Sequence, residues 1–295
     1  MAAILPLYEA IPPRPLRLLR FVGHGPADQL GPVCAPEDRR LAAEGLARAA
    51  RGPGDLLLAE RLDGEAQWAH RLAMPVVRHE PSPRVEIAAP SWEDYLAGRS
   101  AHFRQSVRRG ERKLRREHGL SFRLSDGPHL DADLDSLFHL HELRWQGAAT
   151  RFGKQRAFHR DFAAVALDRG WLRLWLAEIA GRPVAAWYGF RFAGADWHYQ
   201  NGRDPRWNRE GIGFVLLAHT IREAVDDGMR EYKMLLGGES YKDRFATSNP
   251  GLQTLVLGSR LAGTAAARAT AAAARLSPTA RRRLVAVSAR LGIGR

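Results

Sequence analysis

Apolar positions recur with helical spacing over residues 131–148. They lie three to four residues apart, so one face of the segment is apolar throughout, at Leu134, Leu137, Phe138, Leu140 and Leu143. The same spacing predicts a second helix over 155–168. A third is expected over 92–118, where Ser91 can accept the first free backbone N–H groups and Gly119 ends the pattern.

Strand patterns follow these helices. Short glycine turns separate three apolar segments, which predicts an antiparallel meander of strands over 171–179, 183–192 and 196–201. A helix over 212–227 then leads to an apolar segment at 231–236. Because this connection is long, we expect the last strand to have a parallel neighbour.

The first 90 residues give a more irregular pattern. A helix is expected over 37–50, and strands over 55–61 and 67–77 are expected to form a hairpin around Asp63-Gly64. A short strand is also expected over 85–88. Near the other end of the chain, residues 252–257 supply a last strand.

The length and the cysteine content limit the class of protein. A chain of 295 residues can bury a substantial core, which favours two packed subdomains. The lone Cys34 excludes an intrachain disulfide and a cysteine cluster for a structural metal. There is no apolar segment of about 20 residues, and prolines and arginines interrupt the first 20 positions, where a signal peptide would have its apolar core. We therefore expect a soluble, cytoplasmic protein without a metal.

The net charge of +13 is unevenly distributed. Residues 99–118 carry eight Arg or Lys against two Glu, and residues 259–295 carry eight Arg and no acidic residue. Such clusters favour phosphate-rich partners or an anionic membrane surface. A solvated helix face and a soluble tail are the alternative interpretations.

The most informative segment is the glycine turn that opens the helix over 212–227. Glycines at a helix start bring free N–H groups and the positive end of the helix dipole to one point, which suits a pyrophosphate. The candidate groups for such a site are Arg206, Asn208, Arg209, Gly211, Ile212, Gly213 and Phe214. An ordinary helix start is the alternative interpretation.

The order of helices, meander, glycine turn, helix and parallel strand resembles the GNAT acyltransferase superfamily. The motifs that carry the likeness are Glu178-Ile-Ala-Gly-Arg-Pro-Val-Ala-Ala, Tyr199-Gln-Asn-Gly, Gly211-Ile-Gly and Gly238-Glu-Ser-Tyr-Lys-Asp-Arg-Phe. The chain looks most like the CelD/BioF2-like acetyltransferase branch. Its basic helix is also similar to that of Fem-type aminoacyl-tRNA transferases. One departure is Asn208, where the superfamily usually has Gln or Arg.

The resemblance implies an α/β (α+β) fold with a mixed, mostly antiparallel sheet flanked by helices. It also implies two GNAT-like halves, of which the first is degenerate. The expected domains are a shortened N-terminal half over 1–90, a GNAT acyltransferase domain over 91–258 and a basic helical or disordered tail over 259–295.

The resemblance also implies site residues. Tyr241 is expected to act as the general acid, Glu239 as the base for an ammonium acceptor, and Lys242 as a fixed positive charge. The alternative interpretations are an aromatic anchor for Tyr241, a solvent-exposed loop residue for Glu239, and a surface ion pair for Lys242. The acceptor is expected to contact Trp145, Glu178, Tyr199 and Asn201. Strand alternation places His198 with Asp196 and Gln200 on one face, and Trp197, Tyr199 and Asn201 on the other.

Three functions are compatible with this pattern. The first is direct transfer of an acyl group from acetyl-CoA or another acyl-CoA to a small-molecule or cell-envelope amine. The second is a Fem-like transfer from an aminoacyl-tRNA, held by the basic residues of 104–116. The third is a non-catalytic binding module whose tail docks on an anionic membrane.

Overall fold

The computed structural model describes residues 2–10, 17–52, 54–146 and 150–258. These residues form two compact units. The first contains 2–82 and 250–258 of the described chain, and the second is Pro83–Asn249. The tail expected over 259–295 and the last two residues of the helix expected over 131–148 lie outside the described residues.

Among the described residues, the second unit has a six-stranded sheet in the order β7-β12-β11-β10-β9-β8. Its strands are β7 (Arg84–Glu86), β8 (Ser121–Leu124), β9 (Leu172–Ile179), β10 (Arg182–Phe192), β11 (Ala195–Arg203) and β12 (Glu231–Lys233). All neighbours are antiparallel except β11 and β12, which are parallel. The predicted meander and the parallel strand after it are confirmed.

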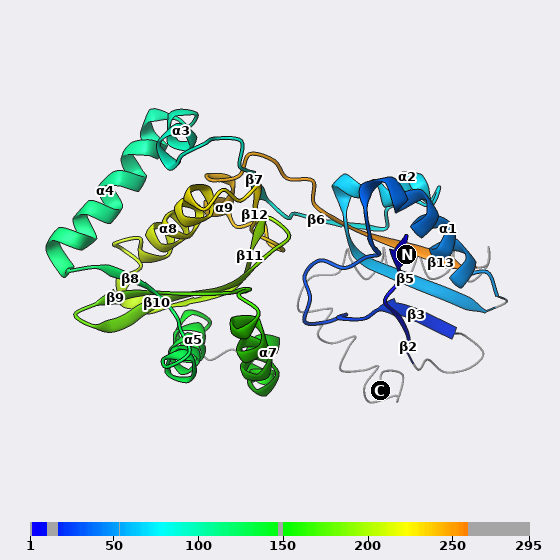
Figure 1. Ribbon diagram of the computed structural model, residues 1–295, viewed down its shortest axis with the longest axis horizontal. Helices are drawn as coiled ribbons and strands as arrows, with labels where there is room; N and C mark the ends of the chain where they lie inside the picture. Colours follow the sequence, from blue (N-terminus) through cyan, green and yellow to red (C-terminus); the bar gives the residue numbers. More distant parts are fainter. Residues whose placement is uncertain (1, 11–16, 53, 147–149, 259–295) are drawn as a thin grey trace. The chain divides into compact units, whose positions relative to one another are not determined.

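Helices cover both faces of this sheet (Figure 1). On one face lies α8 (Ile212–Asp226), and on the other lie α5 (Leu130–Arg144) and α7 (Arg156–Asp168). The remaining helices of the unit are α3 (Trp92–Ala97), α4 (Ala101–His118), α6 (Arg151–Lys154) and α9 (Ser240–Asp243). The predicted mixed, mostly antiparallel sheet flanked by helices is therefore confirmed.

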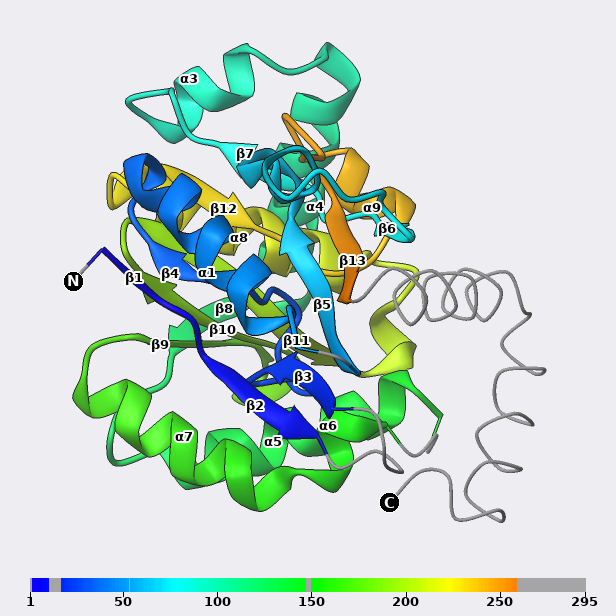
Figure 2. The ribbon, with the colours of Figure 1, turned by 90° about the vertical axis from the view of Figure 1, so that its right-hand side faces the viewer.

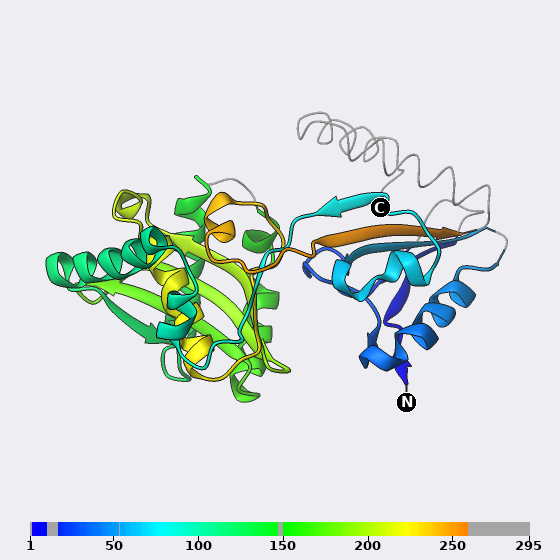
Figure 3. The same ribbon diagram turned by 90° about the horizontal axis from the view of Figure 1, so that it is seen from above.

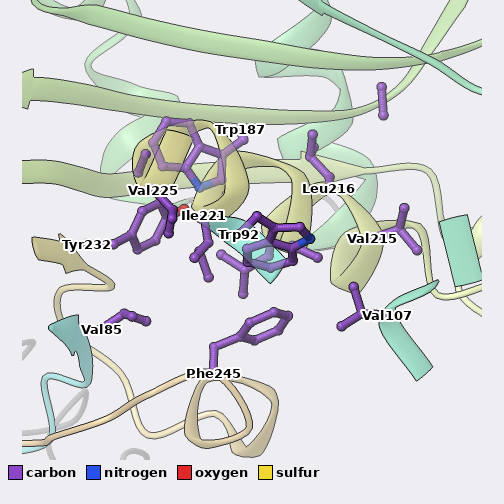
Figure 4. Close-up of a cluster of buried hydrophobic side chains, with 14 of the residues drawn as sticks. Val85, Trp92, Val107, Trp187, Val215, Leu216, Ile221, Val225, Tyr232 and Phe245 are labelled. Atoms are coloured by element: carbon purple, nitrogen blue, oxygen red, sulfur yellow. The ribbon is translucent and has the colours of Figure 1, made fainter. Parts of the chain in front are cut away.

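The core on the α8 face is built around large aromatic side chains. Trp187 of β10 and Tyr232 of β12 are buried with ring centroids 5.8 Å apart. Figure 4 shows them beside Ile221 and Val225 of α8. A second cluster, on the α5 and α7 face, includes Tyr188. Burying both faces fixes the sheet between two helical layers.

The basic segment 92–118 is two helices and not the single helix that its pattern predicts. Ser91 caps α3 by accepting a hydrogen bond from the Asp94 N–H, as expected. The chain then leaves the helix at Gly98, and the Ser100 hydroxyl accepts from the Phe103 N–H to start α4. A second serine cap therefore divides the segment.

Among the described residues, the first unit has a five-stranded sheet in the order β2-β3-β5-β13-β6. Its strands are β2 (Leu7–Ala10), β3 (Arg17–Phe21), β5 (Asp55–Asp63), β6 (Arg78–Glu80) and β13 (Leu252–Gly258), and a small separate sheet pairs β1 (Ala3–Ile4) with β4 (Val33–Cys34). Figure 2 shows β5 and β13 side by side. The helices α1 (Arg39–Ala49) and α2 (Trp68–Arg71) pack on one face (Figure 3).

Two predictions for this part of the chain were wrong. The hairpin over 55–77 does not form, because the Asp63 carboxylate accepts from the Glu65 N–H and starts a helical turn instead. Trp68 is then buried in α2. The strand at 252–257 exists as β13, but it pairs with β5 and β6. It therefore belongs to the first unit, although the sequence placed it with the domain over 91–258.

Candidate functional site

The parallel strands β11 and β12 separate partway along their length. They pair from Ala195 to Trp197 on β11, opposite Glu231–Lys233, whereas β11 continues to Arg203. From His198 onward, the edge of β11 that faces β12 has no strand partner in the described chain. Exposed backbone groups at such an opening are available to a ligand.

A pocket of about 220 Å³ lies at this opening. Its walls come from β10, β11, the turn after β11, the start of α8, and Tyr241. None of the described residues that line it is acidic. A pocket with this lining favours a neutral or anionic ligand over a cation.

The N-terminus of α8 opens onto the pocket without a side-chain cap. Gly211 occupies the N-cap position with a left-handed φ of 71°, which glycine adopts at little cost. Its carbonyl accepts from the Phe214 and Val215 N–H groups. The N–H groups of Ile212 and Gly213 precede these and have no acceptor within the helix. The predicted groups Gly211, Ile212, Gly213 and Phe214 all line the pocket.

Arg203 adds a positive charge to this end of the pocket and was missing from the sequence prediction. Its Nε donates to the Asn208 Oδ1 over 2.7 Å, and both residues line the pocket. By contrast, the predicted Arg206 is exposed and pairs with Asp204 at 2.6 Å. Arg209 is exposed and lies outside the lining. The signal in the sequence was the arginine at the end of the strand before the glycine turn.

A β-bulge changes which residues of β11 face the pocket. Tyr188 pairs with Gln200 and Gly189 with His198, so Tyr199 has no residue opposite it. The extra residue brings Asn201 to the same face as His198, and the Asn201 Nδ2 lies 2.8 Å from the His198 Nε2. The prediction that strict alternation separates these two side chains was wrong. Both line the pocket.

His198 is a buried, neutral member of this wall. Only 5% of its surface is exposed. Burial, assisted by the positive charges of Lys242 and Arg144, holds the pKa of His198 well below its ordinary value. Its Nδ1 has no hydrogen-bond partner among the described residues. The ring therefore adds polarity without charge.

Tyr241, on the loop after β12, also lines the pocket. The pKa of its hydroxyl is raised by burial and by the nearby Glu239 carboxylate, and hydrogen bonds to Asn201 and Arg144 partly offset this. Tyr241 therefore stays protonated at neutral pH. A protonated hydroxyl in a pocket can donate a proton or a hydrogen bond.

The predicted residues on either side of Tyr241 pair with each other. Lys242 is buried, and its Nζ lies 2.9 Å from the Leu236 carbonyl oxygen and 3.0 Å from the Glu239 Oε2. The Glu239 side chain is 42% exposed. Lys242 thus fixes the loop after β12 through its contacts, whereas Glu239 remains accessible.

Three predicted acceptor contacts lie outside the pocket lining. Tyr199 packs in the aromatic cluster on the α5 and α7 face, with its ring centroid 6.2 Å from that of Phe152. Glu178 accepts from the Arg123 Nε over 3.0 Å. Trp145 is 44% exposed, at the end of α5. Only Asn201 of this predicted set lines the pocket.

Comparisons with known proteins match this architecture. Residues 101–243 match the family model described as an acetyltransferase (GNAT) domain. No curated protein sequence matches the chain. No described helix combines the length and the apolar character that spanning a bilayer requires.

Several solved structures have the same fold. One is the C-terminal domain of a candidate lysylphosphatidylglycerol synthetase from Agrobacterium fabrum, which is 15% identical with a TM-score of 0.63, over 91% of this chain and 83% of that one. FemX is 10% identical with a TM-score of 0.60, over 88% and 86%. L-PGS from Bacillus licheniformis is 12% identical with a TM-score of 0.57, over 90% and 85%. At these identities the likeness concerns the fold.

Proposed function

Because residues 101–243 match the family model of an acetyltransferase (GNAT) domain, we propose that the protein transfers an acyl group from acyl-CoA to an amine acceptor. The observation that carries the proposal is the separation of β11 from β12 beside the uncapped start of α8. A thioester can lie along the free edge of β11 while its pyrophosphate reaches the helix N-terminus.

The donor would be held by groups of opposite charge. The free N–H groups of Ile212 and Gly213 and the helix dipole attract phosphate oxygens, and the Arg203 guanidinium adds a full positive charge. Asn208 holds that guanidinium at 2.7 Å. Asn208 thus takes a positioning role in place of the donor that the superfamily usually has there.

The chemistry is a direct displacement. The amine nitrogen attacks the thioester carbonyl carbon, the carbon–sulfur bond breaks, the nitrogen releases one proton as the amide forms, and the thiolate takes one up. We assign that proton to the Tyr241 hydroxyl, because it lines the pocket and its pKa is raised. Glu239, partly exposed on the same loop, is the proposed base for the ammonium form of the acceptor.

Calorimetric titration with acetyl-CoA and free CoA tests donor binding. A Gly211→Trp variant should abolish binding, because the new side chain would enter the pocket at the phosphate end. Gly170→Trp is the matched control. Gly170 has a similar φ, 68° against 71°, and both positions have open space where a Cβ would be, but Gly170 is outside the pocket lining.

In both variants the tryptophan has a positive backbone φ, so both carry the same backbone strain. A difference between them in CoA affinity therefore comes from the side chain that enters the pocket. Micromolar binding to the wild type and to Gly170→Trp, with none to Gly211→Trp, would support the proposal. Binding that survives in Gly211→Trp would place the donor elsewhere. Absence of binding to the wild type would favour a different donor or a non-catalytic role.

A second candidate donor is an aminoacyl-tRNA, and α4 favours it. Phe103, Val107 and Leu114 anchor α4 in the core. Its exposed face carries Arg108, Arg109, Arg112, Lys113, Arg115 and Arg116. Several of these pair with glutamates, but basic side chains outnumber acidic ones on the helix. Such a face can neutralise several phosphates.

Salt dependence separates the two donors. Binding of tRNA through α4 should weaken steeply with salt, and the slope of log K against log salt should become shallower by about 1 for each phosphate contact removed. Arg109→Gln and Arg112→Gln would report this in a filter-binding assay. A slope that the variants leave unchanged would exclude α4 as the contact surface.

A further inference from the structure

The last turn of α5 packs closely against β11, on the opposite face of the sheet to α8 (Figure 1), at Gly202, which lines the pocket. Gly202 of β11 permits this, since a Cβ at Gly202 would lie 2.3 Å from the His141 backbone nitrogen. Arg144 lies one turn beyond His141, at the C-terminal end of α5. The C-terminal end of α5 therefore carries a guanidinium on the α5 side of β11, the strand that separates from β12.

Arg144 is half-buried and contacts the pocket wall through Tyr241. Burial and the Glu239 carboxylate raise the pKa of the Tyr241 hydroxyl, and the nearby Arg144 guanidinium acts in the opposite direction. It also lies over the neighbouring Trp145 ring, with 5.2 Å from Cζ to the ring centroid. Neither contact neutralises its charge. Among the described residues, no carboxylate forms an ion pair with Arg144, and none of those that line the pocket is acidic.

Three other half-buried arginines of this unit are neutralised by a carboxylate. Arg123 pairs with Asp133 at 2.7 Å, Arg191 pairs with Asp196 at 2.6 Å, and Arg222 pairs with Glu111 at 3.2 Å. Partly burying a guanidinium without such a partner costs desolvation free energy, and an anionic ligand would offset that cost. Arg144 differs from these three arginines because no carboxylate among the described residues pairs with it.

The positive charge of Arg144 contributes to the lowered pKa values of neighbouring side chains. Burial, assisted by Arg144, lowers the pKa of His141 to about 4. Burial, then Lys242 and then Arg144 lower the pKa of His198, and burial followed by Arg144 lowers the pKa of Arg203. Arg203 and the neutral His198 line the pocket, and Arg144 and the neutral His141 lie on α5 beside this wall, which together make a suitable environment for an anion.

We propose that Arg144 binds an anionic group of the acyl acceptor, so that the acceptors are amines that carry a carboxylate or a phosphate. This rests on the proposed function, which places the donor at the start of α8. The acceptor then approaches from the α5 side, where its anion meets Arg144 and its amine faces the thioester beside Tyr241. The planar guanidinium fork suits either anion.

Three small product analogues test the proposal on the full chain saturated with CoA. N-acetylglycine carries a carboxylate, N-acetylphosphoethanolamine carries a phosphate, and N-acetylethanolamine is neutral. Saturation-transfer NMR titrations should give at least tenfold tighter binding for one of the anionic compounds than for the neutral one. Which anion binds more tightly identifies the source of the negative charge.

Variants connect the preference to Arg144. Arg144→Gln should remove the preference for the anion, and Arg144→Lys should retain part of it. Arg169→Gln is the matched control, because Arg169 also lies at the C-terminal end of a helix, as the C-cap of α7, and also lies over a tryptophan, Trp171, at 5.7 Å. It should behave as the wild type. CoA affinity should be the same in all four proteins.

The proposal is overturned if neither anionic compound binds, if the neutral compound binds as tightly, or if Arg144→Gln keeps the preference. CoA binding is measured separately in the same samples. If the wild-type protein does not bind CoA, the proposed function is contradicted. If it binds CoA but shows no preference for the anionic compounds, only the role of Arg144 is contradicted.

Discussion

At the scale of single residues, the site depends on groups whose protonation is set by burial. The Tyr241 hydroxyl is kept protonated, and the His198 ring is kept neutral. Both face a pocket whose described lining has no carboxylate. Proton donation by Tyr241 is therefore the feature of the proposed chemistry that a single substitution can remove.

Replacing Tyr241 by Phe should lower kcat by roughly 10² or more while leaving the Kd of acetyl-CoA unchanged, because a general acid acts in the transition state. Thiol release from acetyl-CoA measures kcat. Tyr95→Phe is the control, since the Tyr95 hydroxyl donates to the Phe245 carbonyl at 2.9 Å, away from the pocket. Equal loss of turnover in both variants would assign Tyr241 a structural role.

The pH dependence of turnover has a definite sign. Tyr241 must be protonated to act, so its contribution is lost only as the pH rises through its pKa. Burial and Glu239 raise that pKa above the ordinary value of 10. We therefore expect no fall in kcat attributable to Tyr241 up to pH 9. A Tyr241-dependent decline below that pH would contradict the assignment.

Buried histidines predict acid sensitivity of the fold. Burial lowers the pKa of His159 to about 4, and both ring nitrogens lack partners among the described residues. The folded state holds His159 neutral, because its folded-state pKa is below the ordinary 6.5. The free energy of unfolding is therefore unaffected by this residue above pH 6.5, and it decreases as the pH falls towards 4. At pH 5 the loss should be roughly 2 kcal/mol for such a residue.

His159→Phe should remove that loss. Urea unfolding at pH 7.5 and pH 5.0 should show a smaller decrease in the free energy of unfolding for the variant than for the wild type. Phe fits the site, since His159 packs among aromatic rings, with the Phe152 centroid 4.5 Å away. An identical decrease in both proteins would mean that other groups account for the acid sensitivity.

At the scale of elements, the approach of α5 to β11 determines the inner end of the pocket. Gly202→Ala places a methyl group 2.3 Å from the His141 nitrogen and 2.5 Å from the Leu140 carbonyl carbon. Such backbone contacts cannot be relieved by a side-chain rotation. We expect a loss of stability of about 1–3 kcal/mol from overpacking.

Gly213→Ala is the comparison for this prediction. Its new methyl group would meet the Arg203 Cδ at 3.4 Å, an ordinary contact with a flexible side chain. Urea unfolding should therefore show little change for Gly213→Ala and a clear loss for Gly202→Ala. Equal stabilities would mean that α5 can shift away from β11 without cost.

The elements differ in how well the sequence predicted them. The meander, α5, α7 and α8 were predicted because their periodicity is strong and their neighbours are local. The hairpin at Asp63-Gly64 failed because Asp63 can cap a helical turn as well as form a turn between strands. The bulge at Tyr199 has no pattern of its own, so the joint placement of His198 and Asn201 required the structure.

At the scale of the whole molecule, the chain crosses between units and returns. It leaves the first unit after residue 82, forms the second, and comes back as β13 between β5 and β6. Strand β13 pairs with partners about 190 residues earlier in the sequence. Such distant pairing leaves no local signal, which is why the sequence placed this strand with the preceding domain.

Substitution in β13 should affect one unit and spare the other. Leu255 is fully buried in the first unit, so Leu255→Ala should lower the stability of that unit by about 2–5 kcal/mol. Calorimetric unfolding should show a lowered transition for the first unit, with the acetyl-CoA affinity of the second unit unchanged. Loss of acetyl-CoA affinity would mean that the two units depend on each other.

The central claim is that acyl-CoA lies between the free edge of β11 and the start of α8. Hydrogen-exchange mass spectrometry of the full chain, with and without acetyl-CoA, tests it most directly. We predict slower exchange in peptides covering 198–203 and 211–217, and no change in β5. Unchanged exchange in those two segments at saturating acetyl-CoA, or protection confined to other segments, would contradict the account.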